Sequence, residues 1–314
     1  MKNISKLWVV AIIAISFIAL ACDNGTIDTL FSDVYVVGTN DGKAALWKNG
    51  NLETLNGLGA GISKANAIAV SGANVYVAGM NNSTAALWKN GDVVTLGSLV
   101  GSGGANAIAV SGANVYVAGT NNDEAAWWEN GVLKTLSNLG TYSYAYAIAV
   151  SGADVYVAGK NDGEAALWKN GTLETPGLGG LVGSSGASAI AVSGSTVYVA
   201  GNNSGNTAVY WENKVLKTIA GATAGSSSAN AIAVSGANIY ISGFNGGGAA
   251  YWENGVLKPL TGVIANGITV SDSGVVYAAG QDSSNTAVYW KDGVPQTPTG
   301  AKTGSSSANA IVVK

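Results

Sequence analysis

A repeat of about 40 residues, recurring from residue 33 to the end of the chain, constrains the fold more than any other feature. Each unit carries three markers, and each marker occurs seven times. The first marker is a tyrosine in a short apolar run that ends in a small residue and glycine, at Tyr35, Tyr76, Tyr116, Tyr156, Tyr198, Tyr240 and Tyr277. The second is a tryptophan that follows apolar residues and precedes a turn, at Trp47, Trp88, Trp128, Trp168, Trp211, Trp252 and Trp290. The third is a run of the type Asn-Ala-Ile-Ala-Val, whose last copy is residues 309–313.

Within each unit, short runs of strand-forming residues predict four strands. The runs are of the types Ala-Ile-Ala-Val, Val-Tyr-Val-Ala, Ala-Ala-Leu-Trp and, at residues 132–136, Val-Leu-Lys-Thr-Leu. Ser-Gly-Ala-Asn joins the first strand to the second and Asn-Gly joins the third to the fourth, and both are hairpin turns. Helical periodicity is absent, and the first two strands are apolar on both faces, as in a sheet packed between two others. We therefore predict an all-β, seven-bladed β-propeller over residues 33–314, with four antiparallel strands per blade. The Tyr and Trp series then pack between blades.

The phase of the repeat indicates how the ring closes. The chain enters at the second strand of a unit (33–37) and leaves on a solitary first strand (309–313). We expect this last strand to pair with the N-terminal blade, which leaves no open edge at the join. The alternative is a linear β-array, which needs polar capping repeats that the sequence does not show.

The residue types that are missing exclude several kinds of chemistry. The 314 residues include one cysteine and no histidine, and all 15 positive charges are lysines. Without histidine there is no imidazole base and no zinc site of the usual ligand set. The net charge of −3 and the lack of arginine disfavour nucleic acid as a partner. We expect no nucleic-acid partner, no cofactor and a monomer.

The N-terminus has the pattern of an export signal. Lys2 and Lys6 precede an apolar stretch from residue 7 to residue 15, and Cys22 follows small residues. The segment 19–22, Ala-Leu-Ala-Cys, resembles the bacterial lipobox. We predict a lipoprotein signal peptide at 1–21, lipidation of Cys22, a membrane-anchored tether at 22–32, and a location at the cell envelope. The alternatives are a plain cleaved signal peptide that leaves a free thiol, or an uncleaved anchor helix.

The repeat resembles the HAF-type extracellular repeat of bacteria. The best local match is Gly-Thr-Tyr-Ser-Tyr-Ala-Tyr-Ala-Ile at 140–148, followed by Val-Tyr-Val-Ala-Gly at 155–159 and Ala-Ala-Leu-Trp-Lys-Asn-Gly at 165–171. The resemblance covers residues 33–314 and implies the propeller fold and export. It implies no reaction, and this chain has Ala or Thr in place of the histidine and Ala or Val in place of the phenylalanine that name the repeat.

The links between strands predict where a ligand would bind. Links from second to third strand and from fourth to first are longer than the other two links and vary between units, and they emerge on the same side of an antiparallel blade. We expect binding on this loop face, because variable loops on a rigid scaffold commonly carry binding function.

Two groups of residues are candidates for that site. The residue that enters each first strand should form a collar around the channel: Asn66, Asn106, Tyr146, Ser188, Asn230, Asn266 and Asn309. Such a collar can hydrogen-bond a sugar or a peptide, with Tyr142, Tyr144 and Tyr146 as an aromatic platform. The alternative is that the asparagines satisfy backbone groups at the strand entrance and the tyrosines fill space. Five asparagines among seven positions favour this structural role.

The second group is acidic: Asp123, Glu124, Asp162 and Glu164. Their carboxylates can ligate Ca²⁺, although Asn-Asp-Gly is also ordinary turn chemistry. The leading hypothesis is a non-catalytic envelope lipoprotein that binds a protein or a glycan through its loop face. The alternatives are a histidine-independent hydrolase or lyase that uses these carboxylates, and a purely structural array.

Overall fold

The computed structural model describes residues 32–175, 177–178 and 185–314. The predicted signal peptide, Cys22 and the tether up to residue 31 lie outside these described residues. The account below concerns the compact unit Ser32–Lys314. Within the described ranges, no helix has the length and apolar character needed to cross a membrane.

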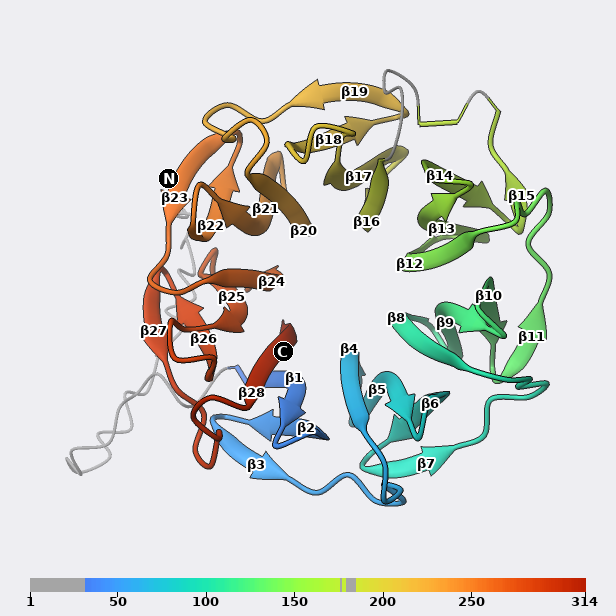
Figure 1. The fold of residues 1–314 in the computed structure, drawn as a ribbon, viewed down its shortest axis with the longest axis horizontal. Helices are drawn as coiled ribbons and strands as arrows, with labels where there is room; N and C mark the ends of the chain where they lie inside the picture. The colour runs from blue at the N-terminus through green and yellow to red at the C-terminus, as the bar shows by residue number, and fades with distance from the viewer. Residues whose placement is uncertain (1–31, 176, 179–184) are drawn as a thin grey trace, which may run out of the picture. The chain divides into compact units, whose positions relative to one another are not determined.

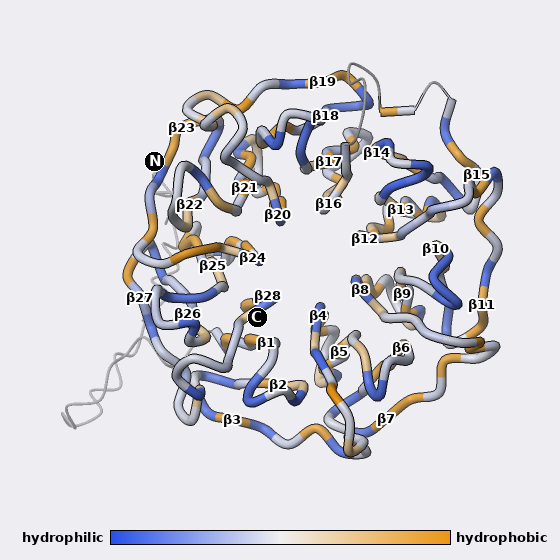
Figure 2. Tube along the Cα trace, in the orientation of Figure 1, coloured by the Kyte–Doolittle hydropathy of each residue, from blue (hydrophilic) through white to orange (hydrophobic). Residues whose placement is uncertain are grey.

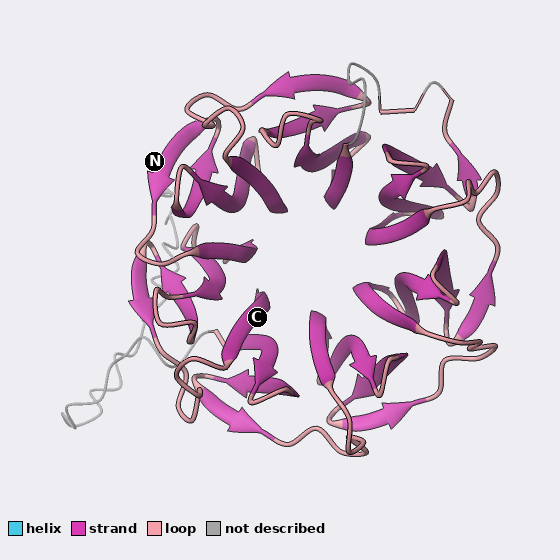
Figure 3. Ribbon diagram, viewed as in Figure 1, coloured by secondary structure: helices cyan, strands magenta, loops and turns pink. Residues whose placement is uncertain are grey.

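The described residues form 28 strands in seven antiparallel four-stranded sheets, arranged as the blades of a propeller (Figures 1 and 3). The predicted all-β fold with seven blades is confirmed. From the channel outward, the first blade consists of β28 (Ser306–Val313), β1 (Val34–Asn40), β2 (Lys43–Lys48) and β3 (Asn51–Glu53), the second of β4 (Ser63–Ser71), β5 (Asn74–Asn81), β6 (Thr84–Lys89) and β7 (Asp92–Val94), and the third of β8 (Gly103–Ser111), β9 (Asn114–Asn121), β10 (Glu124–Glu129) and β11 (Val132–Lys134). In the same order, the fourth blade consists of β12 (Ser143–Ser151), β13 (Asp154–Asn161), β14 (Glu164–Lys169) and β15 (Thr172–Leu173), and the fifth of β16 (Gly186–Ser193), β17 (Thr196–Asn202), β18 (Ala208–Glu212) and β19 (Val215–Thr218). The sixth blade consists of β20 (Ser227–Ser235), β21 (Asn238–Asn245), β22 (Gly248–Glu253) and β23 (Val256–Pro259), and the seventh of β24 (Ile264–Val270), β25 (Val276–Gln281), β26 (Ala287–Lys291) and β27 (Val294–Gln296).

The first blade is built from both ends of the repeat region. β28 pairs antiparallel with β1, from Val34 opposite Val313 to Asn40 opposite Ser306. β28 also lies beside β4 of the second blade and β24 of the seventh (Figure 1). This pairing is consistent with the predicted closure of the ring. The last strand is longer than expected, because it begins at residue 306 rather than 309.

The seven marker tryptophans are the centre of the packing between blades. All seven are between 0 and 1% exposed. Trp128 of β10 packs against Leu87 of β6 and Leu96 of the preceding link, so its ring fills the space between two blades. Its Nε1 donates a hydrogen bond to the Gly97 carbonyl at 3.0 Å. The predicted core role of the Trp series is therefore confirmed.

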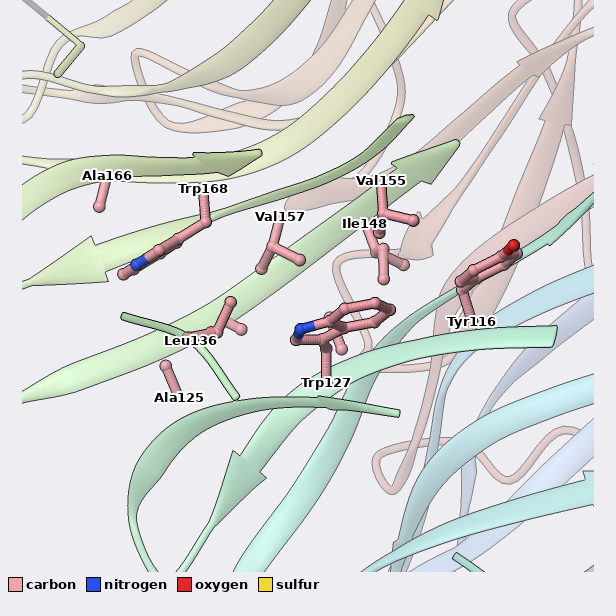
Figure 4. Packing of buried hydrophobic residues seen from close by; sticks show 11 residues of the cluster. Tyr116, Ala125, Trp127, Leu136, Ile148, Val155, Val157, Ala166 and Trp168 are labelled. Atoms are coloured by element: carbon pink, nitrogen blue, oxygen red, sulfur yellow. The ribbon is translucent and has the colours of Figure 1, made fainter. Parts of the chain in front are cut away.

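Figure 4 shows the same kind of packing between the third and fourth blades, where Trp127 and Trp168 lie among Leu136, Ile148 and Val157. The outermost strands are different, because hydrophilic and hydrophobic residues alternate along them (Figure 2). Leu52 in β3 is 50% exposed and Val132 in β11 is 61% exposed. The core therefore lies between blades, and the outer edge faces solvent.

The links correct one prediction. The link from second to third strand has only two residues in five blades, and it has five residues in the other two, at 203–207 and 282–286. The prediction of a long second-to-third link is wrong for those five blades, because residues such as Asn121 and Glu124 pair with each other in the ladder. Both central residues of the turn between β5 and β6, Asn82 and Ser83, have positive φ, as two-residue hairpins require. The links from fourth to first strand are the longer ones, at 54–62, 95–102, 135–142, 174–185, 219–226, 260–263 and 297–305.

Candidate functional site

The long links on the loop face are fastened by asparagines at the ends of second strands. Asn81 Oδ1 accepts a hydrogen bond from the Gly59 amide, and Asn81 Nδ2 donates one to the Gly57 carbonyl, both at 2.9 Å. Asparagine suits this role because one planar group carries both an acceptor and donors. The same pair of bonds is made by Asn40, Asn121, Asn161 and Asn245. Links held in this way lose little conformational freedom when a ligand binds.

One link has an additional clamp. The Lys43 ammonium donates hydrogen bonds to the carbonyls of Gly59, Ala60 and Gly61, at 2.8, 2.9 and 2.6 Å. Three carbonyls around one ammonium use all of its donors. Lys43 therefore holds the link 54–62 in place and is not available to a ligand.

The seven predicted collar residues gather around one hollow at the channel. Its volume is about 520 Å³, and Thr39, Lys64 and Ser307 complete its lining. We call it the mouth hollow. A second space, of about 200 Å³, shares several collar residues and is otherwise lined by Ala and Ile of the innermost strands, such as Ala147 and Ile148. The channel thus has a polar mouth and an apolar throat. That the collar binds a ligand stays a prediction.

Each collar residue is the extra residue of a β-bulge in its innermost strand. In the second blade, Ala65 pairs with Gly79 and Ala67 pairs with Ala78, which leaves Asn66 unpaired in the ladder. The same shift occurs in all seven blades. A bulge redirects a side chain, and here it directs the collar side chains to the channel.

The bulges have a signal in the sequence that we did not use. The glycine that ends each Tyr marker lies opposite the bulge, where an added Cβ would collide with a backbone carbonyl of the innermost strand. Gly79 faces the Lys64 carbonyl in this way, and Gly159 faces the Tyr144 carbonyl. The glycine is required because two backbones approach too closely for a side chain.

The five collar asparagines hold neighbouring blades together. Each donates a hydrogen bond from Nδ2 to the carbonyl of the residue that precedes the bulge in the next blade. The five bonds are Asn66 to Ala105 at 3.0 Å, Asn106 to Ala145 at 2.9 Å, Asn230 to Ala265 at 3.2 Å, Asn266 to Ala308 at 3.1 Å and Asn309 to Ala65 at 2.9 Å. The asparagines therefore have a structural role, although their partners lie in the adjacent blade and not in their own loops.

The other two collar residues do not make this bond. Among the described residues, Tyr146 donates no hydrogen bond to Ala187 and Ser188 donates none to Ala229, the carbonyls that correspond to the five above. Tyr146 is half-buried and stacks in parallel on Tyr144, with ring centroids 5.9 Å apart and planes 1° apart. Burial raises the pKa of Tyr146, and the nearby Tyr144 adds to this, so the phenol keeps its proton at neutral pH.

The structure separates Tyr142 from the rest of the predicted platform. The Tyr142 side chain is 69% exposed, and the residue is absent from the lining of the mouth hollow. Its backbone amide donates to Asp162 Oδ1 at 3.3 Å. Of the three tyrosines, Tyr146 lines the hollow and Tyr144 stacks on it.

The four acidic candidates lie in or beside the two-residue turns. Asp123 accepts a bond from Ser102 Oγ at 3.0 Å, and Asp162 accepts the Tyr142 bond, so both fasten the links. Glu124 and Glu164 are the first residues of β10 and β14. The residues that the structure describes contain no group of three or more acidic, Cys or His side chains able to hold a metal ion. No carboxylate lines the mouth hollow, so the hollow gives no support to carboxylate-based hydrolysis.

Sequence reasoning missed a further hollow of about 390 Å³ on the tight-turn side, between the first two blades. Tyr35, Leu46, Lys48 and Glu53 are among its lining residues. The hollow is open at the position where four other blades carry an aromatic residue in place of Leu46, namely Trp127, Tyr210, Tyr251 and Tyr289. In the third blade that aromatic, Trp127, stacks on Tyr116 with centroids 6.4 Å apart. In the sequence, the signal for this hollow was the leucine that precedes Trp47, at a position where four other units have an aromatic residue.

No protein-family profile and no curated protein matches this chain. Solved structures match it in fold. A computationally designed protein, Ika8, matches with a TM-score of 0.53 and 19% identity, covering 89% of this chain and 92% of its own. The WD40 β-propeller domain of Doa1 matches with a TM-score of 0.54 and 16% identity, covering 88% and 96%. This chain has the β-propeller fold.

A third match is the extracellular domain of a putative one-component system from B. thetaiotaomicron, with a TM-score of 0.51 and 10% identity. The match covers 89% of this chain and 39% of that one. Sequence identities this low support a shared fold and give no information about ligands. The resemblance to HAF-type repeats and the lipoprotein signal therefore stay predictions from the sequence.

Proposed function

We propose that this protein is a non-catalytic binding module whose mouth hollow recognises a protein or glycan. The observation that carries the proposal is the character of the hollow. Amide, hydroxyl and phenol groups and one lysine, Lys64, line about 520 Å³ with no carboxylate. Such a lining suits a polar ligand rich in hydroxyl or amide groups. It has no pair of carboxylates of the kind that glycosidases use for acid and base catalysis.

The scaffold around the hollow supports the same proposal. Collar bonds such as Asn106 to Ala145 join adjacent blades, and bidentate asparagines such as Asn81 fasten the links. A rigid site holds its polar groups in place before the ligand arrives, which reduces the entropic cost of binding.

The location that we propose is the cell envelope, with the lipid on Cys22 as the membrane anchor. This part of the proposal is supported by the sequence pattern of residues 1–22 and by the resemblance to HAF-type repeats. An extended chain spans at most about 3.5 Å per residue, so the tether from residue 22 to residue 33 would keep the ring within roughly 40 Å of the membrane.

A binding screen tests the proposal. The full chain is presented to arrays of glycans and of envelope proteins, together with the variants Tyr146→Ala and Leu52→Ala. We expect a ligand whose binding Tyr146→Ala reduces at least about tenfold, because an aromatic contact is lost. Leu52→Ala, on the exposed outer strand β3, should bind as the native chain does. A native chain that binds nothing on either array contradicts the proposal.

A further inference from the structure

The hollow between the first two blades, which we call the socket, lies where other blades bury an aromatic ring. Its volume is about 390 Å³, within the range of about 300–1,000 Å³ that ligand pockets have. Tyr35 and Leu46 are the least exposed side chains of its lining, at 7 and 6%, and Glu53 lies exposed at its rim. The counterparts of Leu46 in four other blades are all aromatic: Trp127, Tyr210, Tyr251 and Tyr289.

The lining of the socket repeats the surroundings of Trp127. The Trp127 ring stacks on Tyr116 and packs in one cluster with Val155 of the next blade (Figure 4). Its Nε1 also lies close to Gly171, since a Cβ added there would be 3.9 Å away. The counterparts of these three neighbours all line the socket, namely Tyr35, Val75 and Gly91. The socket therefore offers an incoming ring the neighbours that the protein gives to its own ring.

Leucine precedes the marker tryptophan in two other blades, but a neighbouring side chain covers both of those places. Beside Leu87, its ladder partner Val94 packs against the same hydrophobic cluster. Beside Leu167, Lys214 of the fifth blade lies 3.0 Å from Glu174 at the end of the fourth, so an ion pair bridges the two blades.

At the socket, neither kind of cover is present. Glu53 stands at the position of Val94 and Glu174, opposite Leu46 in the ladder, and it is exposed. Gly91 stands at the position of Lys214 and has no side chain that could reach Glu53. Among the described residues, Glu53 makes no ion pair. The space beside Leu46 therefore stays open to solvent.

We propose that the socket binds a tryptophan or tyrosine side chain of a partner polypeptide. The ring packs on Tyr35 and Leu46, and it meets the ammonium of Lys48, whose Nζ lies 5.3 Å from the centroid of the Tyr35 ring. The rim carries one cation, Lys48, and one anion, Glu53, which suits a neutral residue within a chain better than a charged free metabolite. Aromatic side chains seated in pockets are common anchors of protein interfaces.

This inference does not rest on the proposed function. The socket lies on the tight-turn side, whereas the mouth hollow lies on the loop face, and the two share no lining residue.

The repeat supplies the variant that tests the socket. Leu46→Tyr introduces the residue that stands at the equivalent position in three blades, so the protein's own ring fills the space. The melting temperature should be unchanged or higher, while the partner loses its site. The matched control is Leu52→Tyr, the same change in the same blade on the exposed outer strand.

The experiment presents the purified full chain to an array of short peptides that carry one tryptophan or tyrosine at the centre and vary at the flanking positions. The best peptide is then titrated by calorimetry. We expect binding that weakens at least about tenfold when the central aromatic residue is replaced by alanine, and by a similar factor in Leu46→Tyr. Leu52→Tyr should bind as the native chain does. Free indole and p-cresol, which are the two side chains without a polypeptide, should bind at least about tenfold more weakly than the peptide.

Three results would overturn the inference. The first is an array on which no peptide binds, and the second is peptide binding that survives Leu46→Tyr. The third is binding of indole or p-cresol as tight as that of the best peptide, which would rule out a polypeptide as the preferred partner.

Two further variants keep the test decisive. Loss of peptide binding in Tyr146→Ala would place the peptide in the mouth hollow, which overturns the socket and supports the proposed function. If Leu46→Tyr melts well below the native chain, Glu53→Val replaces it, because valine covers the equivalent place in the second blade. Unchanged peptide binding in Glu53→Val would then overturn the inference.

Discussion

Asn309 donates a hydrogen bond from Nδ2 to the backbone carbonyl of Ala65, 2.9 Å away and 244 residues distant in sequence. The bond joins β28, the last strand of the chain, to β4, the innermost strand of the second blade. It therefore crosses the boundary between the blade that holds both ends of the repeat region and its neighbour.

Asn309→Ala should lower the free energy of unfolding by about 1–2 kcal/mol, because the Ala65 carbonyl loses its side-chain partner. Urea denaturation followed by circular dichroism measures the change. The control is Asn51→Ala in the exposed strand β3 of the same blade, which we expect to stay within about 0.5 kcal/mol of the native value. Equal effects at the two positions would show that the collar bond does not stabilise the ring.

Trp128→Leu should destabilise the protein more than Trp127→Leu, although the two residues are adjacent. Trp128 is fully buried and its Nε1 donates to Gly97. Trp127 Nε1 is buried without a partner among the described residues, and leucine already stands at the equivalent position in three blades. We expect Trp128→Leu to lower the free energy of unfolding by about 3 kcal/mol. The decrease for Trp127→Leu should be smaller by about 1–2 kcal/mol, and denaturant unfolding measures both. The reverse order would contradict the assignment of Trp128 to the packing between blades.

The ion pair of Asp33 and Lys48 predicts a pH dependence. Lys48 Nζ lies 2.7 Å from Asp33 Oδ2, and the hydrogen bond from Lys48 lowers the pKa of Asp33, with a further contribution from Asn49. A carboxylate whose pKa is lower in the folded state stabilises the fold above its unfolded pKa of about 3.9. That stability is lost as the pH falls through the folded pKa. The same partner raises the pKa of Lys48, so its contribution persists up to the ordinary lysine range and is lost above it.

Asp33→Asn should therefore cost less than about 1 kcal/mol at pH 7, because the pair is about 40% exposed and screened by solvent. The difference from the native chain should shrink as the pH falls from 5 to 2. Unfolding free energies at several pH values measure it, with Asp41→Asn, in a turn of the same blade, as the control. A difference that stays constant down to pH 2 would rule out the ion pair as its source.

Lipidation of Cys22 is tested in bacterial cells that are fed radiolabelled palmitate. Label should enter the native chain and be absent from Cys22→Ser, because the thiol is the proposed attachment point. Ser32→Ala, at the end of the tether, serves as the control and should be labelled normally. Label that remains in Cys22→Ser would refute the anchor.

Much of the architecture was predictable from the sequence. The number of blades follows from the seven Tyr and seven Trp markers, and the four strands per blade follow from short apolar runs separated by turns such as Asn90-Gly91. These signals are local, because strand propensity and hairpin geometry depend on residues close together in the chain. The pairing of the last strand with the first blade followed from the phase of the same pattern.

The site was predictable in part. The seven collar positions could be placed at one hollow from their phase, but Tyr142 could not be separated from Tyr144 and Tyr146. The second-to-third links looked longer than they are, because Asn121 and Glu124 read as loop residues although they pair in the ladder. Whether a polar residue at a strand end pairs or stays in a loop depends on its partner strand, which a single segment does not reveal.

The repeat pattern thus specifies the ring, since periodic burial and turn chemistry act within one unit. The differences between units come from contacts across units. The bond from Asn66 to Ala105 joins two adjacent blades, and among the described residues the equivalent bond is missing at Tyr146 and Ser188. Close packing of neighbouring blades sets these distances, and for that reason the differences between units are visible in three dimensions and hidden in the repeat.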